Sequence, residues 1–254
     1  MRKLEFNVGS LGSRVVGYIH DRVKEQCQTH SAHPALIILP GGGYWMLSSR
    51  EADPVALKFF AHAINTFTLY YPILDDIRKE KPVETLKACV QYIVDHAAFL
   101  GVDTSRMAVL GFSAGGHLAA SYGTICKGEH LNTMLLGYPV ISSRYMGLNG
   151  KTFKNLCQSE DEVEWYSLEN RVDDDTLPSF IFHTADDAHI PVENSLVFAQ
   201  RLSAHHIPFE LHIYPSGAHG SSVCTNEVGS HNPVEGQWVG QALAWLCRTW
   251  NYVE

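Results

Sequence analysis

The 254-residue chain has a deficit of basic residues, no long hydrophobic run and no cysteine motif. Its 19 lysines and arginines stand against 27 acidic residues, so the net charge is −8. This balance provides no electrostatic footprint for nucleic acid or for an anionic membrane surface. Apolar runs such as residues 35–40 are far shorter than a membrane span, and the basic start of the chain is not followed by the apolar region of a signal peptide. We therefore expect a cytoplasmic globular protein.

The six cysteines form no C-x-x-C pair and no cluster with histidine. They are scattered as Cys27, Cys89, Cys126, Cys157, Cys224 and Cys247. A chain of this size buries enough surface to fold without disulfides or metals. The cysteines are therefore expected to be reduced, mostly buried apolar side chains, as in other cytoplasmic proteins.

Strand-like and helix-like segments alternate along most of the chain. Strands are expected at residues 14–20 (in an N-terminal hairpin), 35–39, 65–71, 107–110, 133–140, 179–183 and 209–214. Helices are expected at residues 53–63, 82–100, 116–122, 193–205 and 234–250. This alternation predicts an α/β fold, with a mainly parallel sheet of about eight strands and helices on both faces.

Residues 142–178 interrupt the alternation. This segment is polar, with acidic stretches at residues 160–164 and 173–175 and only weak helical patterns. We interpret it as a solvated surface insertion in preference to a small cap over the active site. Because no repeat or linker divides the chain, residues 1–254 are predicted to form a single domain.

The motif with the clearest chemistry is G-x-S-x-G at residues 111–115, between a predicted strand and a predicted helix. In such an elbow the serine lies on a tight turn that exposes its hydroxyl above the sheet, and the glycines allow neighbouring backbone to approach closely. The helix N-terminus that follows favours developing negative charge. Ser113 is therefore the candidate nucleophile.

A glycine run at residues 41–43 follows the buried strand 35–39 and can supply donors to an oxyanion. The N–H groups of Gly42 and Gly43, together with that of Ala114 directly after the nucleophile, are the candidates for this oxyanion hole. A phosphate-binding loop is the competing interpretation. No G-x-x-x-x-G-K-[ST] or G-x-G-x-x-G pattern supports it.

The base and its partner are expected in loops after the last strands. His219 lies between glycines immediately after the strand 209–214 and is preferred to His231 and His189. Asp187 follows the strand 179–183 and is preferred to its neighbour Asp186, whose alternative role is to cap a loop. The order Ser113, Asp187, His219 is the one expected for a hydrolase elbow on an open parallel sheet.

These motifs resemble the α/β-hydrolase fold, and within it the hormone-sensitive-lipase-related small esterases, including the acetylxylan-esterase or xylanase-B-like group. The resemblance covers nearly the whole chain and rests on residues 40–44, 111–117, 183–191 and 217–220. It implies hydrolysis of carboxylic esters without a cofactor, often the removal of acetyl groups from sugars. Related lipases have a histidine at the start of the glycine run, where this chain has Pro40 or Gly41.

Three aromatic residues, Tyr44, Trp45 and Tyr138, either line the substrate pocket or belong to the core. No H-x-H or H-E-x-x-H pattern indicates a metal site, and only His30 and His33 lie close together in a loop. The sequence therefore predicts a serine esterase that acts on small acyl esters, with a small molecule as its partner and no metal or cofactor. The alternatives are an arylformamidase or other amidase, which similarly has glycine-glycine-x-tryptophan, and a non-catalytic ligand-binding protein of the same fold.

Overall fold

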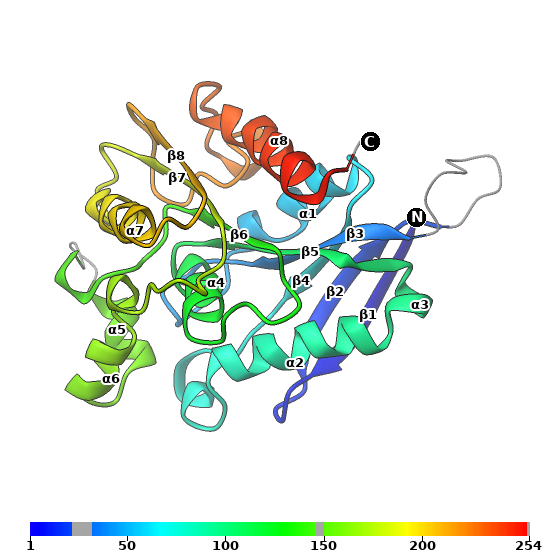
Figure 1. Ribbon diagram of the computed structural model, residues 1–254, viewed down its shortest axis with the longest axis horizontal. Helices are drawn as coiled ribbons and strands as arrows, with labels where there is room; N and C mark the ends of the chain where they lie inside the picture. Colours follow the sequence, from blue (N-terminus) through cyan, green and yellow to red (C-terminus); the bar gives the residue numbers. More distant parts are fainter. Residues whose placement is uncertain (22–31, 146–149, 253–254) are drawn as a thin grey trace.

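Eight strands form one sheet in the order β1-β2-β4-β3-β5-β6-β7-β8 (Figure 1). The structure is a computed structural model that describes residues 1–21, 32–145 and 150–252. The strands are β1 (Arg2–Val8), β2 (Ser13–Ile19), β3 (His33–Leu39), β4 (Asn65–Leu69), β5 (Val102–Phe112), β6 (Thr133–Gly137), β7 (Ser179–Thr184) and β8 (Phe209–Tyr214). Strand β2 is antiparallel to both of its neighbours, and the strands from β4 to β8 are parallel. The predicted N-terminal hairpin and mainly parallel sheet are confirmed.

The helices mostly follow the predicted pattern. They are α1 (Asp53–Phe60), α2 (Pro82–Asp95), α3 (Ala97–Leu100), α4 (Ala114–Thr124), α5 (Lys151–Leu156), α6 (Glu160–Trp165), α7 (Glu193–Ala204) and α8 (Trp238–Trp250). The helix predicted at residues 82–100 is divided at His96, whose backbone leaves the helical region with ψ at 15°. The first helical positions of α1 and α2 contain prolines, which lack an N–H that would have no partner there.

Two apolar clusters cover the two faces of the sheet. On one face, side chains of α1 and α8 such as Phe59 and Trp238 pack on Leu36 and Ile38 of β3. On the other face, α2, α4 and α7 pack on Ile37 and Leu39. Figure 1 shows α8 and α2 on opposite sides of the sheet. Successive residues of β3 face opposite sides of the sheet, and both sides are covered by helices. The strand therefore has apolar side chains at consecutive positions.

Strands β5 and β6 end at the same level, whereas β7 continues to Thr184. Phe112 pairs with Gly137, and Gly137 pairs with Phe182 on the next strand. A Cβ at Gly137 would lie 2.7 Å from the Phe112 ring and 2.8 Å from the Phe182 ring, so only glycine fits between them. Ser113 and Tyr138 leave the sheet directly after the paired residues Phe112 and Gly137, whereas His183 remains paired with β8.

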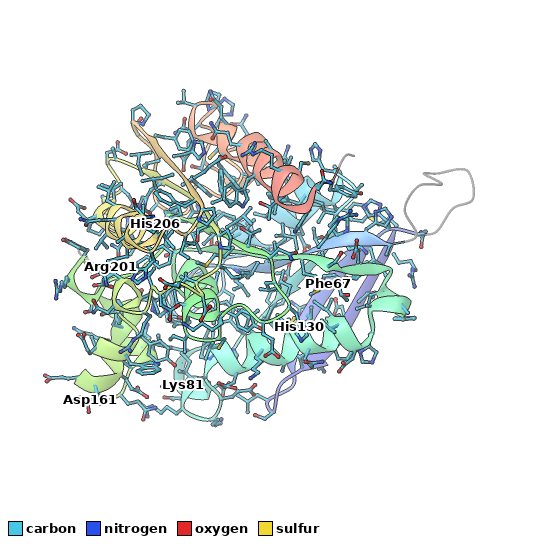
Figure 2. All side chains as sticks on the ribbon, viewed as in Figure 1. Phe67, Lys81, His130, Asp161, Arg201 and His206 are labelled. Carbon is cyan, nitrogen blue, oxygen red and sulfur yellow. The ribbon has the colours of Figure 1, made fainter. Side chains whose placement is uncertain are left out.

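The segment 142–178 contributes α5 and α6 to one end of the molecule. Phe153 and Leu168 are buried in the main apolar cluster, whereas Glu160 and Asp161 are exposed. Figure 2 shows Asp161 at the periphery. The segment thus has a polar outer side and an apolar inner side, with residues 146–149 outside the described part of the chain.

Cys89, Cys126, Cys157 and Cys224 are free thiols, and Cys27 lies outside the described residues. Among the helices of the described residues, none combines the length and the apolar character needed to cross a membrane.

Candidate active site

Ser113 occupies the tight turn between β5 and α4. Its backbone has φ 52° and ψ −115°, a conformation that is costly for a residue with a side chain. Two hydrogen bonds hold the turn: the Ser113 N–H donates to Gly137 O at 2.9 Å, and the Val140 N–H donates to Ser113 O at 3.2 Å. Strand β6 and the residues directly after it therefore stabilise the strained backbone of the elbow.

The glycines of the elbow are required by close packing. A Cβ at Gly111 would lie 2.1 Å from Gly115 O, and a Cβ at Gly115 would lie 2.1 Å from Leu39 O. Both contacts are with backbone, which cannot move aside cheaply. The motif thus allows α4 to begin directly against β3 and β5.

His219 lies between Ser113 and Asp187. Its Nδ1 is 2.7 Å from Asp187 Oδ2, and its Nε2 is 2.9 Å from Ser113 Oγ. Because a carboxylate only accepts, Nδ1 carries the proton toward Asp187, and Nε2 is then free to accept the Ser113 hydroxyl proton. The structure thus brings together the three residues that were selected from distant parts of the sequence.

The Asp187 carboxylate is oriented by four donors. The N–H groups of His189 and Ile190 donate to Oδ1 at 2.8 and 2.9 Å. Burial acts to raise the pKa of Asp187, but hydrogen bonds from His183 and His219 outweigh it and hold that pKa well below its ordinary value. Asp187 is therefore a fixed anion at neutral pH.

The competing residues occupy different positions. Asp186 Oδ1 accepts the Gly217 N–H at 2.9 Å, which is the loop-capping role considered for it. The His189 ring lies nearly parallel to that of His219, with 5.6 Å between their centres, and faces the same cavity. His231 is exposed and does not line that cavity in the described part of the chain.

The glycine loop after β3 is held from both sides. The Gly41 N–H donates to Glu51 Oε2 at 2.7 Å, and the Tyr71 hydroxyl donates to Pro40 O at 2.5 Å. Gly42 has φ 135°, and a Cβ there would lie 2.2 Å from Met46 O. These contacts fix the loop without the histidine that opens the glycine run in related lipases.

The backbone N–H groups of the three candidate oxyanion donors have no hydrogen-bond partner within the described residues. Gly42 and Gly43 line the cavity with Ser113, and no hydrogen bond within the described residues uses their N–H groups. Ala114 is the first residue of α4, a position whose N–H has no partner inside the helix. The N–H groups of all three residues are thus available to a ligand.

Ser113 and His219 open into a cavity of about 370 Å³. Its wall includes Trp45, which is 54% exposed, and Lys151 and Thr152 from the segment 142–178. The same wall includes Arg50, Glu51 and His189. The cavity is large enough for a small acyl ester, and part of the insertion contributes to its rim.

Tyr44 and Tyr138, expected near the pocket, are instead buried beneath it and do not line it within the described residues. The Tyr44 hydroxyl donates to His117 Nδ1 at 3.0 Å, and His117 Nε2–H donates to Tyr166 O at 2.9 Å. Burial lowers the pKa of His117 to about 4, so this ring is neutral. Both tyrosines are buried because their hydroxyl partners lie inside the protein.

Glu51 is a site residue that sequence reasoning missed. Its Oε1 accepts the Tyr138 hydroxyl at 2.7 Å, and the Tyr138 oxygen accepts the Ser222 N–H at 3.0 Å. The Tyr138 ring packs at an angle of 64° on His219, with 5.0 Å between centres. Burial raises the pKa of Glu51, against the hydrogen bonds from Tyr138 and Gly41. Glu51 thus links the glycine loop to the loop of His219. No local sequence motif around Glu51 predicts this role.

The described residues contain no group of three or more histidine, cysteine, aspartate or glutamate side chains that could hold a metal ion. His30, which the sequence places near His33, lies outside them.

Comparison with known proteins places this geometry among esterases and xylan-degrading enzymes. A family model described as BD-FAE matches residues 23–149, which is half of the chain. An endo-1,4-β-xylanase B from Butyrivibrio fibrisolvens is 32% identical over 230 residues, covering 83% of this chain and 35% of that protein. An acetylxylan esterase from Xylanibacter ruminicola is 29% identical over 201 residues, covering 73% of this chain and 40% of that protein. The chain therefore spans 35–40% of the length of these curated relatives.

Among solved structures, an acetyl ester-xyloside bifunctional hydrolase from Caldicellulosiruptor lactoaceticus matches with a TM-score of 0.83 at 30% identity. The match covers 97% of this chain and 91% of the other. The likeness therefore extends over nearly the whole chain.

Proposed function

This chain belongs to the BD-FAE family, among the α/β-hydrolase-fold esterases related to hormone-sensitive lipase, and on that basis we propose that it is a serine carboxylesterase. We propose that it hydrolyses small acyl esters, with Ser113, His219 and Asp187 as its catalytic triad. The observation that carries this proposal is the position of His219, within hydrogen-bonding distance of both Ser113 and Asp187 at the cavity.

In the first half-reaction, Ser113 Oγ attacks the ester carbonyl while its proton passes to His219 Nε2. The carbonyl oxygen becomes an oxyanion, which the N–H groups of Gly42, Gly43 and Ala114 stabilise. Losing one such donor typically costs about 2.7–4 kcal/mol of barrier lowering. His219 then gives its proton to the departing alcohol oxygen as the C–O bond breaks, which leaves an acyl group on Ser113.

In the second half-reaction, water attacks the acyl group and passes a proton to His219. That proton returns to Ser113 Oγ as the acid leaves. Asp187 does not take up the proton but keeps the ring oriented and stabilises its charged form. The low pKa of Asp187 supports this role, because the carboxylate stays ionised throughout.

The substrate is proposed to carry a small acyl group, such as acetate, on a sugar or a similar polar alcohol. Support comes from the cavity of about 370 Å³ and from the relatives whose names refer to acetylated xylan and acetyl ester-xylosides. We further propose that residues 1–254 act as one domain, in which the segment 142–178 forms one side of the cavity through Lys151 and Thr152.

An organophosphonate that carries a fluorescent group tests the nucleophile. We expect a single adduct at Ser113 by mass spectrometry and loss of 4-nitrophenyl acetate hydrolysis in Ser113→Ala. Ser105→Ala, on an exposed part of the same strand, is the matched control and retains activity. An adduct elsewhere, or undiminished turnover in Ser113→Ala, would contradict the proposed mechanism.

A substrate panel separates the candidate functions. It contains acetylated xylo-oligosaccharides, acetylated monosaccharides, aryl esters and N-formylkynurenine. The proposal expects the highest kcat/KM for an acetylated sugar. Preferential hydrolysis of the formamide would indicate an amidase, and failure to hydrolyse any activated ester would indicate a ligand-binding protein.

A further inference from the structure

The cavity above Ser113 is lined by two cations, Arg50 and Lys151, that form no ion pair within the described residues. We propose that the preferred ester carries a carboxylate in its alcohol or acyl part, and that these two side chains bind it. This inference rests on the proposed esterase function and names its substrate class.

The two cations come from separate elements that meet at the cavity. Arg50 lies in the short helical turn Ser49–Glu51 after the glycine loop, and Lys151 is the first residue of α5. A Cβ built on Gly220 would lie 3.0 Å from Arg50 Nη2, so the guanidinium touches the loop beside His219. Arg50 is therefore within reach of a group attached near the reacting ester.

Some cations at other places on the molecule have acidic partners, whereas Lys58, Lys87 and Lys154 form no ion pair within the described residues. Lys81 lies 3.0 Å from Glu162, Arg106 lies 3.3 Å from Asp103, and Arg2 lies 3.1 Å from Asp21. In a chain with a net charge of −8, acidic partners are abundant. Arg50 and Lys151 differ from the other cations without an ion pair in that both line the cavity that contains Ser113.

The carboxylates near the cavity are already occupied. Glu51 lines it, but one oxygen accepts the Gly41 N–H and the other accepts the Tyr138 hydroxyl. The Asp187 side chain is 1% exposed and is bound by His219. Both carboxylates are thus hydrogen-bonded inside the protein, and within the described residues neither forms an ion pair with Arg50 or Lys151.

Exposed charged side chains at a concave site attract ligands of the opposite sign. Arginine also binds carboxylates through two parallel hydrogen bonds, which gives orientation as well as attraction. A carboxylate held by Arg50 would therefore fix the ester relative to Ser113.

Matched esters that both release acetate provide the test. They are 4-acetoxybenzoate, which is an anion, and its neutral methyl ester, compared after correction for their uncatalysed hydrolysis rates. We expect kcat/KM for the anion to exceed that for the neutral ester by about tenfold, the order of one hydrogen bond to a charged group. We expect 0.5 M salt to reduce this ratio.

The ratio should fall about tenfold in Arg50→Gln and in Lys151→Gln, and should be partly retained in Arg50→Lys, which keeps the charge. Lys154→Gln, a change at an exposed lysine on the same helix that is not part of the cavity wall, is the control and should leave the ratio unchanged. Thermal melting shows that each variant is folded.

The outcomes separate the two proposals. Hydrolysis of both esters at equal corrected rates, or an unchanged ratio in Arg50→Gln and Lys151→Gln, overturns the carboxylate inference and leaves the esterase intact. Higher kcat/KM for the dianion 4-acetoxyphenyl phosphate than for the carboxylate shows that the anion class is wrong. Hydrolysis of neither acetate ester contradicts the proposed function itself.

Discussion

His183 brings a second imidazole to Asp187: its Nε2 lies 3.4 Å from Asp187 Oδ2, and both side chains are almost completely buried. The same nitrogen is 3.0 Å from Ile190 O, and His183 Nδ1 is 2.8 Å from Ser195 Oγ. Because Nε2 faces a carbonyl and a carboxylate, it carries the proton, and Nδ1 accepts from the serine. The Asp187 carboxylate is thus held by more than the histidine that takes part in the proposed chemistry.

Asp187→Asn should lower kcat by about 10³–10⁴-fold, because an amide cannot hold His219 in the required tautomer or stabilise its charge. Steady-state kinetics with 4-nitrophenyl acetate measures this loss. Asp186→Asn is the matched control, since Asp186 caps the Gly217 N–H and does not contact His219 in the structure. A larger loss in Asp186→Asn than in Asp187→Asn would show that the wrong carboxylate has been assigned.

Glu51→Gln should reduce kcat by about 10–100-fold with a smaller change in KM, because weaker support of the Gly41 N–H displaces the donors to the oxyanion. Glu169→Gln changes another buried glutamate, which binds Ser142 and does not line the cavity within the described residues. Kinetics and thermal melting of both variants distinguish a catalytic effect from a structural one. The role of Glu51 in positioning the oxyanion donors is rejected if both variants lose activity only in proportion to their loss of stability.

His117 should make stability depend on pH between about 6.5 and 4. Burial lowers the folded-state pKa of His117 to about 4, whereas an unfolded histidine titrates near 6.5. As the pH falls through this window, the unfolded chain binds a proton that the folded chain does not, so stability decreases, by on the order of 3 kcal/mol over the whole window. Below about pH 4 both states are protonated, and the effect is complete.

Urea unfolding of the wild type and of His117→Gln at several pH values between 7.5 and 4 measures this contribution. We expect the variant to have the shallower pH dependence. His206→Gln changes an exposed histidine, labelled in Figure 2, and should retain the slope of the wild type. Identical slopes in the wild type and His117→Gln would contradict the assignment.

Gly115→Ala should prevent folding or destabilise the protein by several kcal/mol, since its Cβ would lie 2.1 Å from Leu39 O. Gly240→Ala in α8 is the opposite case, because nothing lies within 4 Å of its added Cβ. This change should stabilise the helix by about 0.5–1 kcal/mol. Thermal melting of the two variants should therefore give shifts of opposite sign.

The elbow at Ser113 and the loop of His219 could be predicted because each has a local signal, namely glycines at or shortly after the end of a strand. Glu51 has no such signal. One of its partners, Tyr138, is 87 residues away in the sequence, so only the packing of the chain brings them together. Tyr138 itself was expected near the pocket, and a one-dimensional pattern cannot tell that its hydroxyl points to a buried carboxylate instead of a ligand.

The common end of β5 and β6 has a consequence for how such a protein can change. Ser113 and Tyr138 directly follow the paired residues Phe112 and Gly137, so interstrand hydrogen bonds determine where both of them leave the sheet. Longer or shorter loops beyond these points can reshape the cavity wall without displacing the nucleophile. Deleting one residue inside β5, by contrast, would turn every later side chain of that strand to the opposite face. Changes in substrate preference are thus expected in the loops, whereas the sheet keeps the spacing of the reacting groups constant.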